Sequence, residues 1–109
     1  MLKLIKFSVM FYIVIGISNA NARTLSGKIV DMVTWSDGHT AIRIENGPQN
    51  GCTSPDYYSI GVIGQDVKAE PMLSVALAAY ISGRSVNLAT ADGVCQGGQE
   101  KVTALRLLQ

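Results

Sequence analysis

The sequence predicts a small, mainly β protein: a five-stranded barrel with one helix between its third and fourth strands, in the order βββαββ. Three observations support this fold class. Most of the chain after residue 23 has the two-residue apolar period of strands, a helical period appears only between Pro71 and Gly83, and loops rich in Gly, Pro and Asn separate the strands. With 109 residues, 48% of them hydrophobic and 16% charged, the chain suits one domain and excludes disordered and collagen-like classes.

The first two strands form a predicted hairpin. Residues 24–35 are rich in β-branched side chains and predict a long strand with a bend or bulge near Gly27. Residues 36–38 (Ser-Asp-Gly) predict a turn, and residues 39–46 then alternate cleanly, as a half-buried strand requires. A long strand that contains a Gly can bend as a barrel strand must. We therefore expect a barrel rather than another small α+β sheet, which the same order also permits.

Residues 57–63, 84–90 and 100–108 predict the third, fourth and fifth strands, and residues 47–56 and 91–99 predict loops. Five strands with a helix between the third and fourth are the arrangement of the OB-fold, a partly open Greek-key barrel.

The helix is predicted over residues 71–82. Pro71 suits a first helical turn, where a missing N–H is tolerated, and Gly83 suits the position just beyond a helix end. The apolar residues at helical spacing predict the face turned to the core: Leu73, Ala76, Leu77, Tyr80 and Ile81.

The N-terminal segment predicts export. Residues 1–6 are short and basic, residues 7–17 are almost entirely apolar, and residues 18–22 are small or polar and end in Ala. We expect a signal peptide over residues 1–22, cleaved after Ala22, and a secreted or periplasmic domain over residues 23–109. The apolar run of about 11 residues is shorter than the roughly 20 that span a bilayer, so no membrane span is expected after cleavage.

The two cysteines, Cys52 and Cys95, both lie in the expected mature chain. An even pair in a small exported domain predicts one disulfide, which closes a loop of about 44 residues. The chain has no CxxC motif and a single histidine, too few ligands for a zinc site, so no metal and no cofactor are expected.

Charge and residue types limit the classes of function. Lys and Arg number 9 and Asp and Glu 8, and two of the lysines, Lys3 and Lys6, belong to the expected signal peptide. The domain therefore has no basic surface for a phosphate backbone, and nucleic acid is not expected as a partner. The acidic residues are scattered singly, and no Ser or Cys is placed by sequence to act with His39 as a nucleophile, so we expect a non-enzymatic protein.

A binding site is predicted from the OB-fold, which binds oligomeric ligands across its second and third strands, between two loops. The first loop, residues 35–40, contains the single Trp of the chain, and the second is residues 92–99. Aromatic, amide and hydroxyl groups together suit a sugar or peptide groove, although Trp35 would equally suit a cap on the barrel core. The candidate ligand-binding residues are Trp35, Ser36, Asp37, His39, Tyr57, Tyr58, Gln96 and Gln99.

The helix also predicts self-association. Residues 71–82 contain no charged side chain, so a second uncharged face remains beside the core face. Such a face is usually covered, and Met72, Val75 and Ala79 form the expected subunit interface. A monomer is the alternative, because small Ala and Ser side chains are tolerated in water.

The export signal, the strand order, the sequence Ser82-Gly83-Arg84-Ser85-Val86 after the helix and the paired cysteines give the chain a resemblance. It resembles the secreted OB-fold B subunits of bacterial toxins, especially the subtilase-cytotoxin type, and small secreted relatives of them. The resemblance implies a ring-shaped homo-pentamer that binds sialylated glycans. We thus expect an exported, glycan-binding, self-associating protein. The alternative is a structural or accessory subunit that docks a partner protein and binds no small ligand.

Overall fold

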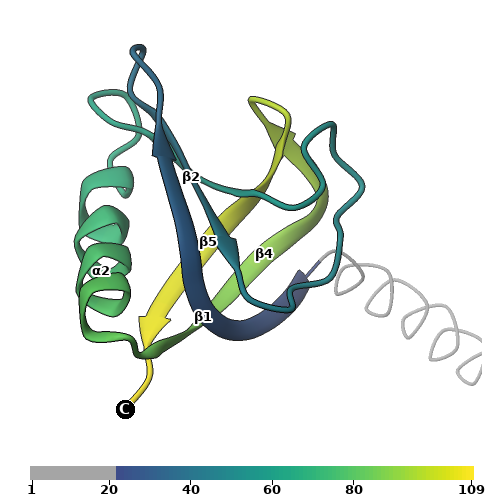
Figure 1. Cartoon of the computed structure of the whole chain (residues 1–109). Coiled ribbons are helices and arrows are strands. Elements are labelled where there is room, and N and C mark those ends of the chain that lie inside the picture. The colour runs from purple at the N-terminus through teal and green to yellow at the C-terminus, as the bar shows by residue number, and fades with distance from the viewer. Residues whose placement is uncertain (1–21) are drawn as a thin grey trace, which may run out of the picture.

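The computed structural model describes residues 22–109, which form a mainly β protein with five strands in a closed barrel and one helix between the third and fourth (Figure 1). This confirms the predicted OB-fold-like class. Around the barrel the strands follow the order β1-β2-β3-β5-β4. Apart from Ala22, the predicted signal peptide lies outside the described residues. The elements are β1 (Ala22–Thr34), β2 (His39–Ile44), β3 (Tyr58–Val62), α2 (Ala69–Ser82), β4 (Ser85–Gln96) and β5 (Gln99–Leu107).

The long strand β1 closes the barrel because it pairs with two neighbours. Residues 22–28 pair with β4, and Ile29 to Thr34 pair with β2, both antiparallel. The predicted irregularity lies between Ile29 and Asp31 rather than at Gly27, because the strand bends where its partner changes. Gly27 instead allows the backbones of β1 and of Glu45 to approach each other closely, since a Cβ at Gly27 would be 3.0 Å from the Glu45 carbonyl oxygen.

The predicted loop over residues 91–99 is mostly strand. β4 continues to Gln96, Gly97 and Gly98 form a two-residue turn, and β5 begins at Gln99. Both turn residues have positive φ, 61° and 90°, as in the tight hairpins that Gly-Gly favours. The glycines that suggested a loop are therefore the means by which two long strands form a hairpin.

The predicted disulfide is confirmed. Cys52, in the β2–β3 loop, is bonded to Cys95 near the end of β4. Close to the disulfide in both segments, the Ser54 N–H donates to the Gly98 carbonyl oxygen at 2.7 Å. The tip of the β4–β5 hairpin is thus held against the β2–β3 loop by a covalent bond and a hydrogen bond.

The helix begins before Pro71 and ends as predicted, with Gly83 in the left-handed region at φ 72°. Its buried residues, however, are Ala69, Met72, Ala76 and Ala79. The prediction that the large side chains of the helix face the core is therefore wrong for three of them, because Leu77, Tyr80 and Ile81 are exposed.

Small alanines explain this orientation of α2. They let the helix axis approach the barrel closely, where a face of Leu and Tyr would not fit without displacing the strands. Met72 and Ala79, expected at a subunit interface, are consequently used in the core. The core consists of Ile29, Ile42, Ile44, Tyr58, Ile60, Met72, Ala76, Ala79, Val86, Leu88 and Val102.

An ion pair joins a buried carboxylate to a mostly buried arginine. Glu100 is fully buried, its Oε2 lies 3.2 Å from a guanidinium nitrogen of Arg23, and the same oxygen accepts a hydrogen bond from the Thr90 hydroxyl at 2.5 Å. Arg23 also donates to the Tyr58 hydroxyl at 3.3 Å, which donates to the Pro48 carbonyl oxygen at 2.6 Å. Burial raises the pKa of Tyr58, so the phenol remains a neutral donor at neutral pH.

Candidate ligand-binding rim

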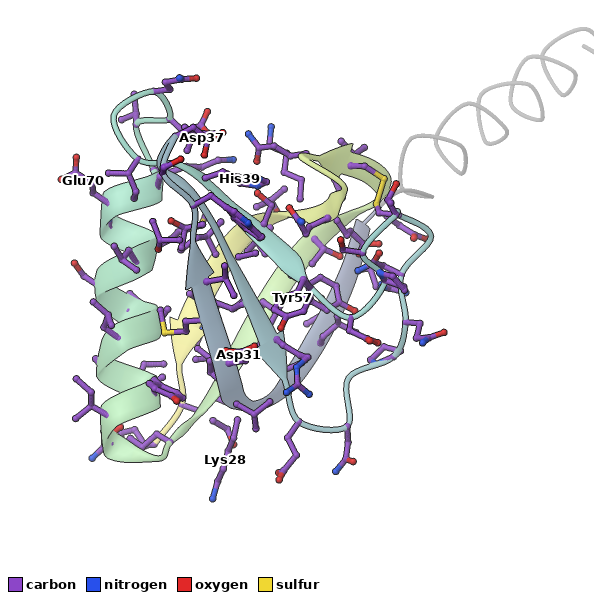
Figure 2. All side chains as sticks on the ribbon, turned by 45° about the horizontal axis from the view of Figure 1, so that its top comes forward. Lys28, Asp31, Asp37, His39, Tyr57 and Glu70 are labelled. Atoms are coloured by element: carbon purple, nitrogen blue, oxygen red, sulfur yellow. A yellow bond between two sulfur atoms is a disulfide. The ribbon has the colours of Figure 1, made fainter. Side chains whose placement is uncertain are left out.

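One end of the barrel gathers three turns. The Ile63 N–H donates to the Gly38 carbonyl oxygen at 2.8 Å, which joins the β1–β2 turn to the segment between β3 and α2. The β4–β5 tip contacts the same place, since Gly97 packs on the imidazole of His39. We call this end the rim, made of residues 35–39, 63–67 and 96–97. Figure 2 shows Asp37 and His39 together at this end.

Four side chains of the rim and β3 form a continuous chain of hydrogen bonds, the polar chain. His39 Nε2 is 3.0 Å from Ser59 Oγ, and Ser59 Oγ is 3.0 Å from Gln96 Oε1. Gln96 Nε2 is in turn 3.1 Å from Asp66 Oδ2. The polar chain links β2, β3 and β4 to the turn before α2, so it fixes the three parts of the rim relative to one another.

The direction of each hydrogen bond follows from Asp66. The Val62 N–H donates to its carboxyl group at 2.7 Å, and this bond, followed by one from Gln96, holds the pKa of Asp66 below its usual range. Asp66 is therefore an ionised acceptor at neutral pH, and the Gln96 amide nitrogen must face it. Gln96 Oε1 then accepts the single hydroxyl proton of Ser59, so His39 Nε2 must donate to Ser59.

This direction is the reverse of what nucleophilic catalysis needs. A histidine that activates a serine accepts the hydroxyl proton, whereas His39 donates to Ser59 and the serine proton points to Gln96. Ser59 is also fully buried. The polar chain is therefore arranged to hold His39 in one position rather than to deprotonate Ser59.

The fixed imidazole supports Trp35. The two ring centroids are 5.3 Å apart with a tilt of 34°, and the Trp35 side chain is 44% exposed. The His39 backbone N–H donates to Asp37 Oδ1 at 3.0 Å, which orders the turn between the two rings. Trp35 lies outside the hydrophobic core, so the indole ring presents an ordered, partly exposed aromatic surface to solvent.

A hollow of about 180 Å³ adjoins the far end of the polar chain. It is lined by the turn before α2 and by the first turn of that helix, including Asp66 and the almost fully exposed Val67. Gln65 and Glu70 add an amide and a second carboxylate. The hollow therefore offers hydrogen-bond acceptors and donors at the part of the rim formed by residues 63–67.

Of the other predicted ligand-binding residues, Ser36 is exposed in the rim, at the β1–β2 turn. The remaining three lie elsewhere, and of these Tyr58 belongs to the core and Gln99 is buried. Tyr57 donates its hydroxyl to Asp31, and Figure 2 shows this pair well away from His39. That hydrogen bond, more than burial, raises the pKa of Tyr57.

OB-folds bind ligands on the outer face of their second and third strands, and in this protein the β4–β5 tip covers part of that face. Ser59 of β3 and His39 of β2 both lie on it, and the β4–β5 tip places Gln96 and Gly97 over them. A Cβ at Gly97 would be 1.9 Å from His39 Cε1, so the tip lies directly on the imidazole. The accessible part of the site is consequently the rim around Trp35.

Sequence patterns alone did not identify Ser59, Asp66 or Gly97. Ser59 lies on a short strand and Asp66 in a turn, and their roles depend on contacts with residues far along the chain. Two glycines with positive φ, Gly61 and Gly64, precede Asp66 and were the available sign of a constrained turn after β3.

No family model matches the chain, and neither a curated protein nor a solved structure matches it. Within residues 22–109, no cluster of three or more His, Cys, Asp or Glu is arranged to hold a metal ion. No helix in that same part of the chain has the length and apolar character to cross a membrane. The fold and rim define a class of protein: a small OB-fold-like barrel, cross-linked by a disulfide, with an aromatic and polar surface at one end.

Because the polar chain includes the ionised Asp66, the stability of the fold should depend on pH. A carboxyl group whose pKa is lowered by folding contributes stability above its usual pKa of about 3.9, and this is lost as pH falls through the lower folded value. We expect Asp66→Asn to lower the melting temperature at pH 7, and the difference from wild type to shrink as the pH falls below the usual pKa of Asp and through the lower folded value. Thermal melts across this range measure it, and a difference that does not change with pH would contradict the role of Asp66.

Proposed function

We propose that the protein is an exported, non-enzymatic binding protein that takes a glycan on its rim, in the manner of a toxin B subunit. The exposed indole of Trp35, stacked on a His39 that the polar chain holds in place, is the observation that carries the proposal. A pyranose ring has one apolar face that packs on an aromatic ring, while its hydroxyls need hydrogen-bond partners at the edge. Ser36, Asp37 and the hollow beside Asp66 would supply those partners.

The charge of the rim favours a neutral sugar. Residues 35–39, 63–67 and 96–97 include Asp37 and Asp66 and contain no Lys or Arg. Lys68 and Lys101 lie near enough to Asp66 to lower its pKa, so its charge is partly balanced, and Asp37 is the acidic group of the turn that carries Trp35. Like charges across a binding site are unfavourable, so the rim suits a neutral oligosaccharide better than the sialylated glycan that the resemblance implies. The export part of the proposal is supported by the disulfide, which is typical of oxidising compartments.

Trp35→Ala should abolish glycan binding and leave the fold intact. Trp35 contributes to no core contact, so its loss removes the binding surface without opening a cavity. We expect calorimetric titration to show at least a tenfold loss of affinity, about 1.4 kcal/mol or more, with an unchanged melting temperature.

Trp35→Phe is the matched variant, because it keeps an aromatic face and should retain part of the affinity. Equal binding by wild type and Trp35→Ala would place the site elsewhere. A wild-type protein that binds none of a panel of neutral and sialylated oligosaccharides would favour the accessory subunit that docks a partner protein.

A further inference from the structure

We propose that β5 accepts an extended peptide segment of another protein as an additional strand, in the groove between β5 and α2. The groove shares no residue with the rim, so this inference does not rest on glycan binding. Two features of the same place carry it: a strand edge that lacks a partner strand, and an apolar groove beside that edge. The peptide that fits both has a large apolar side chain and an acidic side chain close to it.

The unpaired edge belongs to the C-terminal part of β5. Along residues 99–107 this strand has β4 as its antiparallel neighbour on one side. On the other side, β3 pairs with residues 100 and 101 of β5 and with none of the later ones. Within the described part of the chain, residues 102–107 therefore have a neighbouring strand on one side alone.

The ladder between β4 and β5 shows which backbone groups of this edge are unpaired. The Leu108 N–H donates to the Ser85 carbonyl oxygen at 2.9 Å, so it points to β4. Because the direction alternates along an antiparallel strand, the N–H and C=O groups of Leu105 and Leu107 point away from β4. No backbone hydrogen bond among residues 22–109 joins these groups to α2 or β3. Strand-edge groups of this kind are a template for a further strand.

The groove beside this edge has a volume of about 330 Å³. Figure 1 shows β5 running towards the last turn of α2, so the strand and the helix form its two walls. Its apolar lining consists of Pro71, Met72, Val75, Ala104 and Leu105. In strand addition, backbone hydrogen bonds supply affinity and pockets receive alternate side chains of the peptide. An edge next to an apolar groove provides both.

Charge specifies the acidic side chain of the peptide. Lys68 is exposed and lines the groove, and none of the other lining residues is charged. After the hydrogen bond from Val62, Lys101 and Lys68 both help to lower the pKa of Asp66, so the two ammonium groups lie near the same end of the groove. Asp66 balances one of these charges and leaves one. A carboxylate beside the apolar side chain of the peptide would therefore face an opposite charge.

A phage-displayed library of random linear peptides is the probe for this site. The full chain, produced with its own N-terminal segment in an exporting host, is the target. We expect the enriched peptides to alternate apolar and polar residues and to include Asp or Glu. In a synthetic copy of the best peptide, N-methylation of one alternate set of backbone amides should weaken binding at least tenfold. Methylation of the other set should have little effect, because those amides face away from β5.

Variants of the protein place the peptide in the groove. Val75→Glu introduces a carboxylate among the apolar side chains and should weaken binding of the same peptide at least tenfold. Ser74→Glu is the matched control, because Ser74 is exposed and does not line the groove, and the affinity should not change. Trp35→Ala should also bind the peptide normally. Lys68→Glu should weaken binding, and a peptide with Lys in place of its acidic residue should restore it.

Hydrogen exchange tests the strand edge itself. In the free protein the Leu105 amide should exchange faster than the Arg106 amide, which faces β4, and the bound peptide should slow the exchange of Leu105. A library that enriches no peptide overturns the proposal, as do enriched peptides whose affinity is the same for wild type and Val75→Glu. Light scattering covers a second copy as occupant: a wild-type oligomer that Val75→Glu converts to a monomer also overturns it.

Discussion

Replacing Arg23 by Met is expected to destabilise the domain by about 3 to 5 kcal/mol, the cost of leaving one partner of a buried ion pair unpaired. Glu100 is fully buried, and Arg23 is its one cationic partner among the described residues. Within residues 22–109, Glu100 Oε1 and Arg23 Nε have no hydrogen-bond partner, so the carboxylate depends on the bonds to its other oxygen. A loss of this size is a large part of the stability of so small a domain.

Urea unfolding at pH 7 measures this loss, and a double variant serves as control. Arg23→Met combined with Glu100→Leu removes both charges, and we expect it to recover most of the stability, because apolar replacements of a buried pair are often neutral. A decrease below about 1 kcal/mol for Arg23→Met alone would contradict a buried role for the pair, since that is the value of a surface ion pair. Arg23 is also the first residue of the expected mature chain, so correct cleavage would preserve this contact.

Removing the disulfide should have an effect of similar size. The bonded cysteines are 43 residues apart, and closing a loop of this length restricts the unfolded chain by about 4 kcal/mol in the entropic model. The variant with both Cys52→Ser and Cys95→Ser should therefore lose about that much stability in urea unfolding. It should also loosen the β4–β5 tip, because the Ser54 to Gly98 hydrogen bond is then the nearest remaining link to the β2–β3 loop.

The wild-type protein treated with a dithiol reductant provides the comparison. It should unfold at the same urea concentration as the double Ser variant, and the reductant should not affect the variant. If the variant were as stable as the oxidised protein, the hairpin tip would be held by noncovalent contacts alone. The cross-link would then contribute nothing to the rim.

The parts of the fold that depend on local signals could be predicted from the sequence. The Ser-Asp-Gly turn, Pro71 and Gly83 act within a few residues, and the apolar period identifies strands wherever one face is buried. The disulfide was predicted from the expected export and from the cysteine count, since two cysteines allow a single pairing. The OB-fold also predicted that residues 35–40 and 92–99 lie at the same end of the barrel, which the contact of Gly97 with His39 confirms.

The errors came from long-range packing. The helix has no charge between Pro71 and Ser82, so its core face could be predicted only from the spacing of the apolar side chains, and the close fit of Ala76 and Ala79 decided it otherwise. The polar chain joins residues up to 37 positions apart, and periodicity carries no information on such pairs. The same holds for Arg23 and Glu100, whose charges gave no sign that they are buried together.

Intrinsic fluorescence of the wild-type protein during titration with neutral oligosaccharides tests the central claim most directly. Trp35 is the single Trp of the chain, so emission excited selectively from Trp rather than from the four tyrosines comes from the proposed binding surface alone. A sugar that packs on the indole excludes water from it. We therefore predict a saturable blue shift with neutral sugars and a weaker response to sialylated ones. Emission that stays unchanged while calorimetry detects glycan binding would place the site away from Trp35 and contradict the account.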